Sequence, residues 1–481
     1  MQFKVWAESP AGERRVFMYD NETNTLSSDN GFVFQDNERM KEAAGQGTVS
    51  IPFDKHTGLK KSKLVRVLKI QLGLSCNYSC NYCSQRFVER ADETSKKDVE
   101  SFMKKLEHLD FNEQTGLKIE IWGGEPLVYI KTILPLVEAL QKKFIKWEHK
   151  PHFSMITNGS LLTDELCEWL YNNQFSVAIS HDGPGQSVRG PDPFVDPEKK
   201  DTVLRFYRRM RKQGRISFNS MLNVNNMSRK VVSDWFREFT GDPNVSLGEG
   251  GIIDAYDADG LKNALSTKKD HFLFRQTALN DIFQGDGDIG FTGILEKIDN
   301  FTRSVLTHQP AENLAQKCGM DDESVLAVDL RGNVVTCQNV SAASTAMNGM
   351  QHMGGNIVNM DAVTIRSSTH WRNRPDCAGC PVLHICQGAC MFLDGDFWDT
   401  SCNNAFSDAI PLFALSIYKI TGYIPSYIEA DHLPPERRDI WGTILEHEEF
   451  AQKDVALATT TQAKIVVEGT EVYTKASLAA V

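Results

Sequence analysis

The sequence predicts an α/β protein with a parallel β-sheet. Strand-like and helix-like segments alternate from about residue 65 to residue 247. Such alternation is typical of a parallel sheet with helices packed on it. In addition, glycine-rich or polar turns directly follow the strand-like segments. Barrel-type α/β proteins place their chemistry at the carboxyl ends of parallel strands, so these turns are where we expect a functional site.

Six strand-like segments are rich in branched apolar residues, and amphipathic segments separate them. The expected strands are Leu64–Leu72, Lys118–Trp122, His152–Thr157, Val177–Ser180, Ile216–Val224 and Val245–Leu247. The expected helices are Ser95–Leu109, Ile133–Phe144, Thr163–Asn172 (with Thr163 as N-cap), Thr202–Gln213 and Val231–Phe239. Together they make about six β/α units.

Composition places the chain among globular proteins. Its 481 residues are 41% hydrophobic and 24% charged, which excludes wholesale disorder. The net charge of −11 argues against broad nucleic-acid binding. No run approaches the roughly 20 apolar residues of a membrane helix, and the N-terminus lacks a secretory pattern. We therefore expect a cytoplasmic protein without nucleic-acid or membrane partners, in which thiols stay reduced.

The first group of cysteines is the triplet Cys76, Cys80 and Cys83, spaced C-x3-C-x2-C. Chance would give roughly 0.006 such triplets in a chain with this cysteine content. Three thiolates on one loop can bind three irons of a cubane iron–sulfur cluster and leave the fourth iron open to a small molecule. A zinc ion is the alternative, but it would need a fourth ligand, and His152 and His181 are distant in sequence.

The second group contains seven cysteines. After Cys318 come 13 residues, Gly332, four residues and Cys337; the spacing C-x2-C-x5-C-x3-C follows, and then one more cysteine. Taken alone, the C-x2-C-x5-C-x3-C quartet also fits a zinc knuckle. The full group is Cys318, Cys337, Cys377, Cys380, Cys386, Cys390 and Cys402. The remaining Cys167 lies in an amphipathic segment, and we expect it to be a buried core residue.

The triplet, with an aromatic residue before its last cysteine, resembles the signature of the radical S-adenosylmethionine (SAM) superfamily. The Gly-Gly-Glu-Pro turn after the second strand resembles the family's GGEP motif, which approaches the methionine end of SAM. A Thr-Asn-Gly turn and a Ser-His-Asp-Gly-Pro segment with a following arginine resemble those that hold the adenosine and carboxylate of SAM. The resemblance implies these cofactor-binding residues: Tyr82, Gly123, Gly124, Glu125, Asn158, Ser180 and Arg189.

The seven later cysteines resemble the SPASM extension, which holds two auxiliary iron–sulfur clusters. The wiring of that extension implies that Cys318, Cys337 and Cys390 bind the first auxiliary cluster. The second would be bound by Cys377, Cys380, Cys386 and Cys402. Seven thiolates are one fewer than two cubanes need, so one iron of the first auxiliary cluster is open or takes an oxygen or nitrogen ligand. The resemblance implies three 4Fe–4S clusters in all.

The resemblance also implies the architecture: a partial, open (β/α)6 radical SAM barrel, a C-terminal SPASM domain and a small β-rich N-terminal module. We place the N-terminal module, with strands at Phe3–Trp6 and Arg15–Tyr19, in residues 1–62 and the barrel in 63–255. A connecting helical segment follows in 256–315, and the SPASM domain in 316–405. A helical segment broken by prolines, the first at Pro411, occupies 406–450, and a tail with one strand-like run at Lys464–Val467 occupies 451–481.

Radical SAM enzymes of the SPASM type act mostly on peptides and proteins. The resemblance therefore implies an oxidoreductase that forms a 5′-deoxyadenosyl radical and installs a carbon–carbon or thioether crosslink in a ribosomally made, leader-bearing peptide. A reductant such as flavodoxin or ferredoxin would supply electrons. For a catalytic base the late barrel region offers Glu249, Asp254 and Tyr256. Asp182 is a fourth candidate, although we expect it to shape its turn.

Two alternatives remain open at this stage. An anaerobic sulfatase-type maturase would form formylglycine, but such enzymes usually carry an aspartate where this chain has Gln338, and they have an eighth cysteine that is missing here. The other alternative is non-enzymatic: an iron–sulfur electron carrier or a zinc-stabilised scaffold. Neither would need cofactor-shaped loops at successive strand ends.

Overall fold

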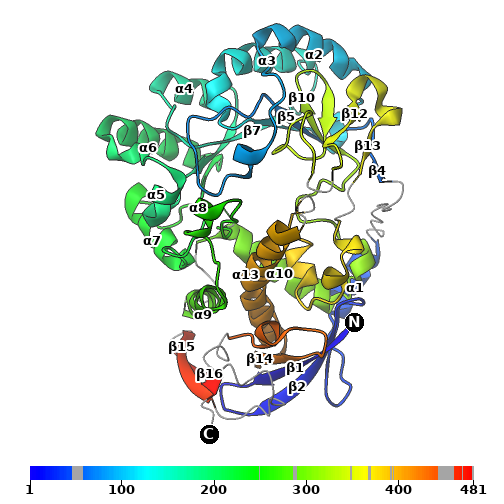
Figure 1. Ribbon diagram of the computed structural model, residues 1–481, viewed down its shortest axis with the longest axis vertical. Coiled ribbons are helices and arrows are strands. Elements are labelled where there is room, and N and C mark those ends of the chain that lie inside the picture. The colour runs from blue at the N-terminus through cyan, green and yellow to red at the C-terminus, as the bar shows by residue number, and fades with distance from the viewer. Residues whose placement is uncertain are drawn as a thin grey trace.

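The computed structural model describes residues 1–45, 58–248, 250–284, 290–346, 349–366, 370–390, 393, 395–441, 460–467 and 470–478. An open barrel with its outer helices occupies the top of Figure 1, and two long helices packed on a small sheet occupy the bottom. The candidate base Glu249 and residues 442–459 of the predicted C-terminal segments lie outside the described residues.

The main sheet has eight strands in the order β12-β11-β10-β5-β6-β7-β8-β9. The strands β5 to β9 run parallel to one another in chain order. This arrangement confirms the predicted α/β class with a parallel sheet. The five strands are β5 (Val67–Gln71), β6 (Lys118–Trp122), β7 (His152–Thr157), β8 (Ser176–Ser180) and β9 (Ile216–Asn219).

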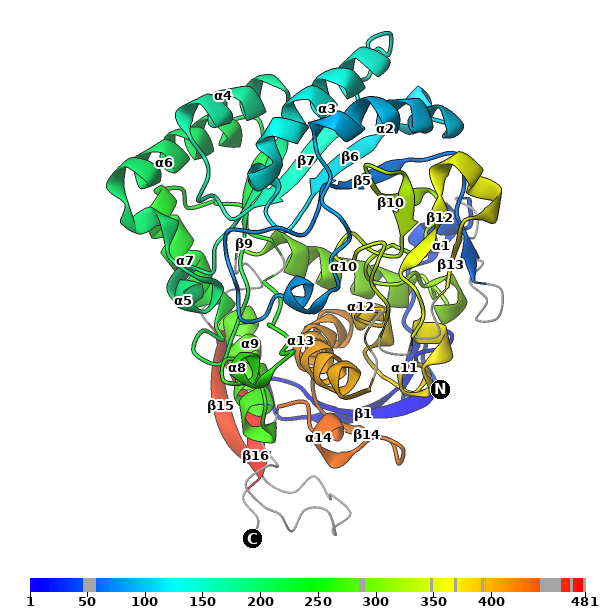
Figure 2. The ribbon, with the colours of Figure 1, turned by 45° about the horizontal axis from the view of Figure 1, so that its top comes forward.

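Helices cover one face of the parallel strands and form the outer layer in Figures 1 and 2. Every second strand side chain, such as Ile119, Ile121 and Val177, is buried beneath them, as the period of a strand requires. The opposite face lines an interior cavity of about 370 Å³. The covering helices are α2 (Val99–Lys105), α3 (Ile130–Lys143), α4 (Asp164–Asn172), α6 (Pro197–Arg211) and α7 (Arg229–Thr240).

Two details of the barrel bear on the sequence predictions. The hydroxyl of Thr163 accepts a hydrogen bond from the backbone of Leu166, which confirms the predicted N-cap, and Cys167 is buried in α4 as expected. By contrast, the sixth predicted strand is reduced to two isolated parallel bridges of Leu247, one with Phe218 and one with Phe291. Only four residues separate the preceding Asp-Pro turn from Gly248, which leaves little length for a longer ladder.

The auxiliary-cysteine region extends the same sheet. β10 (Val325–Asp329) pairs in parallel with β5, and β11 (Asn333–Val335) and β12 (Met353–Asn356) continue antiparallel. Gly332 forms the β10–β11 turn with a φ of +79°, and an added Cβ would lie 3.0 Å from Ile357. Glycine tolerates both the positive φ and the close approach of Ile357. This explains why a glycine stands at this position between Cys318 and Cys337.

A second sheet, in the order β14-β1-β2-β3, forms the floor of the lower half. β1 (Gln2–Glu8) and β2 (Arg14–Asp20) contain the two predicted N-terminal strands, and β3 (Thr25–Ser28) follows. β14 (Ile424–Glu429) pairs antiparallel with β1. From the sequence we expect these residues in two separate segments, 1–62 and 406–450, with helix in the second. The structure unites them in one sheet.

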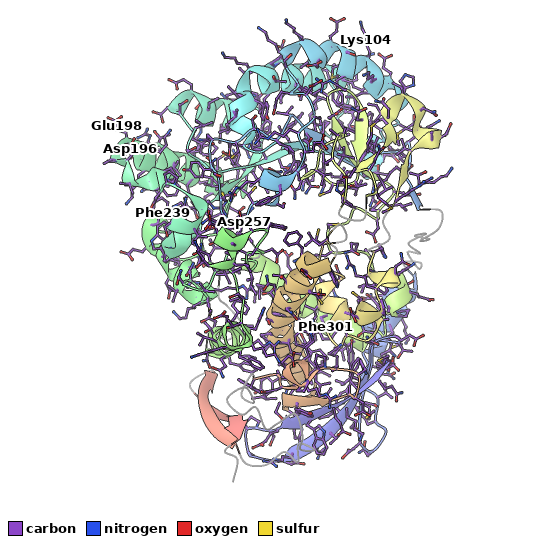
Figure 3. The ribbon with its side chains drawn as sticks, viewed as in Figure 1. Lys104, Asp196, Glu198, Phe239, Asp257 and Phe301 are labelled. Carbon is purple, nitrogen blue, oxygen red and sulfur yellow. The ribbon has the colours of Figure 1, made fainter. Side chains whose placement is uncertain are left out.

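Two long helices, α10 (Thr292–Leu306) and α13 (Gly395–Thr421), cover this second sheet. The ring of Phe301 on α10 lies 6.1 Å from Tyr19 and 5.7 Å from Phe413 on α13 (Figure 3). α13 continues through Pro411, where the sequence predicts a break. The side chains around Pro411 are buried, and this packing outweighs the cost of about 3 kcal/mol for a proline inside a helix.

The remaining elements are short or peripheral. The connecting segment is helical as predicted, with α8 (Ala258–Leu261) and α9 (Lys268–Gln284). In the predicted tail, β15 (Thr460–Val467) and β16 (Thr470–Leu478) form a hairpin, of which the sequence predicts only the first strand in part. The others are α1 (Asn37–Gly45), β4 (Leu59–Lys60), α5 (Gln186–Arg189), β13 (Thr364–Ile365), α11 (Pro375–Ala378), α12 (Leu383–Cys386) and α14 (Pro435–Arg438).

Short 3-10 helices connect many of these elements. They are η1 (Ser84–Phe87), η2 (Lys96–Asp98), η3 (Leu106–His108), η4 (Glu113–Thr115), η5 (Pro126–Tyr129), η6 (Gly183–Gly185), η7 (Pro193–Val195), η8 (Ala311–Asn313), η9 (Ile357–Ala362) and η10 (Trp371–Asn373). Among the described residues, no helix combines the length and apolar character that crossing a membrane requires.

We expect Phe301→Ala to lower the free energy of unfolding by about 3–5 kcal/mol, because it leaves a cavity among buried rings. Urea denaturation followed by circular dichroism measures the change. Ile145→Ala is the matched control: its side chain is 67% exposed, so the loss should stay below about 0.5 kcal/mol. Equal losses in the two variants would contradict the proposed packing role of Phe301.

Candidate active site

The three cysteines of the triplet lie on the loop that follows β5. Cys76 is exposed, and Cys80 and Cys83 are partly buried. Burial raises the pKa of Cys80 to about 11; the charge of Arg189 opposes the shift, and the thiols of Cys83 and Cys76 add to it. Interactions of this kind require short separations. The structure therefore brings the three predicted ligands together.

The Gly-Gly-Glu-Pro turn supports the triplet loop from the end of β6. The backbone N–H of Gly124 donates to Gly73 (3.1 Å), and that of Glu125 donates to Ser75 (3.0 Å). A Cβ on Gly124 would lie 2.5 Å from the carbonyl oxygen of Leu74 and 2.6 Å from that of Ser75. Only glycine permits this approach, so the motif glycine fixes the height of the cysteine loop over the sheet.

Glu125 joins the ends of β6 and β7. Its buried carboxylate accepts hydrogen bonds from the backbone of Leu127 (3.0 Å), the hydroxyl of Thr157 (2.7 Å) and the backbone of Asn158 (2.7 Å). Burial raises the pKa of Glu125, and these donors oppose the shift. Asn158 in turn donates to Asn77 on the triplet loop (2.9 Å). Both predicted cofactor residues thus also hold the loops in place.

Gly123 and Ser180 mark the carboxyl ends of two strands. A Cβ on Gly123 would lie 3.2 Å from the ring of Tyr129, so this turn is also tightly packed. Ser180 is the last residue of β8. It is half-buried on the same strand face as Ala178, which lines the interior cavity. The structure therefore places Ser180 at the rim of the barrel interior.

Asp182 ties the triplet loop to the ends of β8 and β9. Its fully buried carboxylate accepts hydrogen bonds from Tyr82 Oη (2.7 Å), Arg189 Nη2 (2.8 Å) and the backbone of Met221 (2.8 Å). A buried carboxylate with three donors is not an accessible base, so Asp182 is not the fourth base candidate that the sequence allows. Local sequence shows only the turn and not the three remote partners.

Arg189 presents an unused donor beside the triplet loop. Its guanidinium lies 5.5 Å from the ring centroid of Tyr82. Burial alone would lower the pKa of Arg189, but the charge of Asp182 raises it above its ordinary value. Arg189 Nε is buried and has no hydrogen-bond partner among the described residues; the same holds for Ser220 Oγ and Asn223 Nδ2 after β9. Unsatisfied buried donors are costly, and a carboxylate ligand beside the triplet loop would satisfy Arg189 Nε.

The later cysteines form two separate groups. Burial raises the pKa of Cys337 to about 12, and the thiols of Cys390 and Cys318 add to the shift, while Lys69 on β5 opposes it. The side chain of Gln71, on the same strand face as Lys69, donates to the backbone of Gln338 (2.7 Å) and Val340 (2.5 Å). Lys69 and Gln71 were missed from sequence. Both residues alternate along the strand with the buried Leu68 and Ile70, and this alternation could have shown that they share the opposite face.

The other group gathers where α11, α12 and α13 meet. Burial raises the pKa of Cys380 to about 12; Arg437 opposes the shift, and the thiols of Cys386 and Cys402 add to it. Burial also raises the pKa of Cys377, with contributions from the same two thiols and from Cys380. Arg437 Nη2 donates to Cys402 Sγ (3.3 Å). This grouping matches the interleaved order that the resemblance implies.

The two groups are linked by a short left-handed segment. Gln387, Gly388 and Ala389 have φ values of 51°, 77° and 46°, which non-glycine residues rarely adopt. The amide of Gln316 donates to the carbonyls of Gly388 (3.0 Å) and Ala389 (2.9 Å). The segment reverses the chain directly between Cys386 and Cys390, so adjacent cysteines enter different groups.

The thiol groups are not arranged as sites for one ion. Among the residues described, no three His, Cys, Asp or Glu side chains converge on a single metal position. Zinc needs four ligands on one ion, whereas the ligands of a cubane bind different irons. Each group also has at least one cation within electrostatic reach: Arg189 for the triplet, Lys69 for the first later group, and Arg437, Arg374 and Lys317 for the second. Multiple thiols beside a cation suit an anionic iron–sulfur cluster.

Of the predicted bases, two lie in the loop that faces α13. The side-chain amide of Asn404 donates to Asp254 (2.8 Å), and burial raises the pKa of Asp254. Burial also raises the pKa of Tyr256, with smaller contributions from Asp254, Cys390 and Cys83. Tyr256 is therefore within electrostatic reach of one thiol of the triplet, Cys83, and of Cys390. Figure 3 shows the neighbouring Asp257 on the side of the barrel that faces α13.

Comparison with known proteins gives a consistent result. Residues 70–234 match the family model of the Radical SAM superfamily. The radical SAM cyclopropyl synthase TigE of Paramaledivibacter caminithermalis is 21% identical over 356 residues, which cover 69% of this chain and 69% of that protein. The cysteine-type anaerobic sulfatase-maturating enzyme of Clostridium perfringens is 23% identical over 335 residues, which cover 66% of this chain and 85% of that enzyme.

A solved structure shares the fold. Native anSMEcpe with bound AdoMet and the Cp18Cys peptide superposes with a TM-score of 0.52, at 20% identity, over 74% of this chain and 99% of that chain. At this identity the likeness concerns the fold alone. It extends beyond the barrel, because the family match spans residues 70–234 only.

We expect Gly124→Ala to displace the triplet loop, because the new Cβ would meet two backbone oxygens at 2.5–2.6 Å. Protein reconstituted anaerobically with iron and sulfide should then hold about a third less iron than wild type, the share of one cubane in three. Gly251→Ala is the matched control, since its Cβ would meet only Met221 Cε at 3.8 Å. Unchanged iron in Gly124→Ala would refute the supporting role of the turn.

Proposed function

Because the chain carries a radical SAM domain over residues 70–234, we propose that it is a maturase that uses SAM to install a carbon–carbon or thioether crosslink in a ribosomally made peptide. The observation that carries the proposal is the buried, unpartnered Nε of Arg189 beside the triplet loop. This donor fits the carboxylate of SAM. The maturase relatives support a peptide or protein as the substrate.

Under this proposal the triplet cysteines hold the first 4Fe–4S cluster. When bound, SAM and this cluster supply a 5′-deoxyadenosyl radical that removes a hydrogen atom from the substrate. The chain itself orients the site: Asp182 fixes Tyr82 and Arg189, and Glu125 joins two strand ends. The SAM site would be formed by Tyr82, Gly123, Gly124, Glu125, Asn158, Ser180 and Arg189.

We assign an auxiliary 4Fe–4S cluster to each later cysteine group. Lys69 stands beside the first group and Arg437 beside the second. Because thiols must lose their protons to bind metal, a neighbouring cation favours loading. The first group has only three cysteines, so one iron there is left for another ligand. We further propose that a one-electron reductant such as flavodoxin or ferredoxin supplies the electrons and that the protein is cytoplasmic.

Asp254 is the base that the geometry favours. Asn404 holds one of its carboxylate oxygens. Burial raises its pKa above that of an ordinary aspartate, with Asn404 and Lys317 opposing the shift. A carboxylate with a raised pKa accepts a proton more readily. Asp254 would therefore take the proton that leaves the substrate, and the electron that leaves with it would pass to an auxiliary cluster. Tyr256, two residues further on, would lie within electrostatic reach of Cys83 and Cys390.

Formylglycine formation is the second candidate, because relatives of the chain include sulfatase-maturating enzymes. The residue after Cys337 argues against it. Gln338 stands there, with its side-chain oxygen 3.7 Å from the Cys337 sulfur. An amide has no basic site that could accept a proton from a substrate at neutral pH. We therefore rank crosslink formation first.

Replacing Cys76, Cys80 and Cys83 together by alanine should abolish the formation of 5′-deoxyadenosine, because no cluster can then bind at the SAM site. Chromatography with mass detection after dithionite reduction measures the product. About two thirds of the iron should remain in the auxiliary groups. Cys167→Ala is the matched control: it removes a buried cysteine from α4 and should keep full cleavage. Cleavage in the triple variant would overturn the assignment.

The product distinguishes the two candidate reactions. With a precursor peptide encoded next to this chain, we expect a product lighter by two hydrogens for each crosslink, unreactive towards an aldehyde-specific hydrazide probe. The isolated core peptide without its leader should turn over more slowly, because recognition of a flexible substrate is spread along its length. A hydrazide-reactive product would establish the formylglycine reaction instead.

A further inference from the structure

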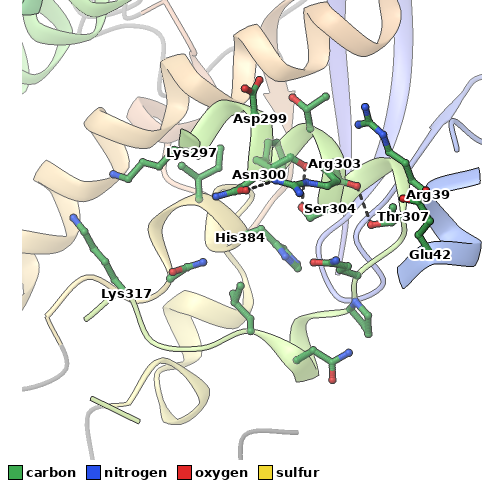
Figure 4. A pocket seen from close by; sticks show the side chains of 18 residues that line it. Arg39, Glu42, Lys297, Asp299, Asn300, Arg303, Ser304, Thr307, Lys317 and His384 are labelled. Atoms are coloured by element: carbon green, nitrogen blue, oxygen red, sulfur yellow. Dashed lines mark hydrogen bonds between the residues drawn. The ribbon is translucent and has the colours of Figure 1, made fainter. Parts of the chain in front are cut away.

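A large cavity lies in the lower half of the molecule, outside the barrel. It measures about 990 Å³, the upper end of the range of about 300–1,000 Å³ for ligand pockets. Residues of α10 form one wall, α1 closes one end and the α12 region closes the other side (Figure 4). The reaction proposed above does not use this space.

The lining is cationic although the chain is acidic. Four basic side chains face two carboxylates in the cavity, against a net charge of −11 for the whole chain. Arg303 Nη2 donates to the neutral amide of Asn300 (2.6 Å), so this contact does not neutralise its charge. Asp299 is balanced from outside by Lys419 (3.6 Å). Lys297 lies 3.7 Å from Asp408, which also binds Arg229. Arg39 forms an ion pair with Asp36 (3.3 Å) that is exposed to solvent and therefore weak. The basic residues are Arg39, Lys297, Arg303 and Lys317, and the second acid is Glu42.

The rest of the lining is built for hydrogen bonding. Amide side chains, among them Gln309 and Asn313, and hydroxyl groups outnumber the apolar side chains. The hydroxyl of Thr302 is buried and has no hydrogen-bond partner among the described residues. This chemistry suits an extended polypeptide rather than a lipid or an aromatic molecule.

The cavity runs toward the proposed chemistry. Arg39 and Glu42, on α1 at the edge of the N-terminal sheet, lie at one end in Figure 4, and Lys317 lies at the opposite end. Lys317 precedes Cys318, and its charge lowers the pKa of Asp254 and of Cys386 against the effect of burial. An occupant of the cavity would therefore reach from the N-terminal half to the region of the candidate base.

We propose that this cavity binds an acidic, extended segment of the substrate peptide, remote from the residue that reacts. The inference rests on the proposed function, since it assumes a peptide substrate. A concave cavity favours a peptide segment over the convex surface of an acidic reductant protein. The two Arg side chains at the outer part, Arg39 and Arg303, are expected to select for acidic side chains.

The test measures binding and not turnover. A fluorescein-labelled decapeptide of Glu, Gly and Ser is titrated with the full, cluster-loaded chain, and anisotropy reports binding. We expect it to bind more tightly than the same peptide with Lys in place of Glu, and to weaken at 0.5 M salt because screening shortens the reach of charges. The double variant R39E/R303E should lose at least about tenfold in affinity, whereas R303K should bind like wild type.

Lys104→Glu is the matched control, because it reverses one exposed charge on α2, far from the cavity. It should leave binding unchanged. If R39E/R303E fails to fold, R39E alone serves, since Arg39 is exposed on α1.

Equal affinity for the acidic and basic peptides, or unchanged binding in the charge-reversed variants, would overturn the inference. The inference would also be overturned if the charge-reversed variants lost flavodoxin binding but kept peptide binding. Because SAM cleavage is not part of the readout, failure of the proposed function is detected separately, as missing 5′-deoxyadenosine.

Discussion

The pairing of β5 with β10 is the constraint on which the rest of the structure depends. Five residue pairs, from Val67–Val325 to Gln71–Asp329, join the first barrel strand to the auxiliary region in parallel. The triplet loop leaves β5 at its carboxyl end, and the chain returns past Gln71 after Cys337. A shift of one residue in this ladder would turn Lys69 and Gln71 to the opposite face. The two thiol groups nearest the barrel are therefore placed by one set of backbone hydrogen bonds.

The three cysteine groups share one electrostatic arrangement. In a chain with a net charge of −11, each group has at least one cation that favours the thiolate form, among them Arg189, Lys69 and Arg437. Burial works in the opposite direction and raises the pKa of most of these thiols. Because thiols must lose their protons to bind metal, these cations would favour the loading of each group with an iron–sulfur cluster. The cations come from three different parts of the sequence, so the arrangement exists only in the folded chain.

The sequence predicts best those elements whose signal is local. The bounds of β6 and β7 agree with prediction because branched apolar residues end at a glycine or asparagine turn. The motif cysteines and glycines are likewise visible from spacing. Contacts between remote residues are not visible: Asp182 accepts from Tyr82 and Met221, and Lys4 on β1 pairs with Glu429, 425 positions away. The same reason explains why β14 and the continuous helix through Pro411 were not foreseen. Both depend on the N-terminal sheet and on α10, which supply the buried surface that local sequence lacks.

The left-handed segment from Gln387 to Ala389 has a consequence for how the auxiliary sites are assembled. Three residues in fixed, uncommon backbone conformations, clamped by Gln316, act as a rigid spacer of set length between Cys386 and Cys390. Neither sulfur can be repositioned without moving the other. The two auxiliary sites are therefore mechanically coupled. A displacement of Cys386 would be passed on to Cys390, and the reverse, because the short segment between them is held by Gln316.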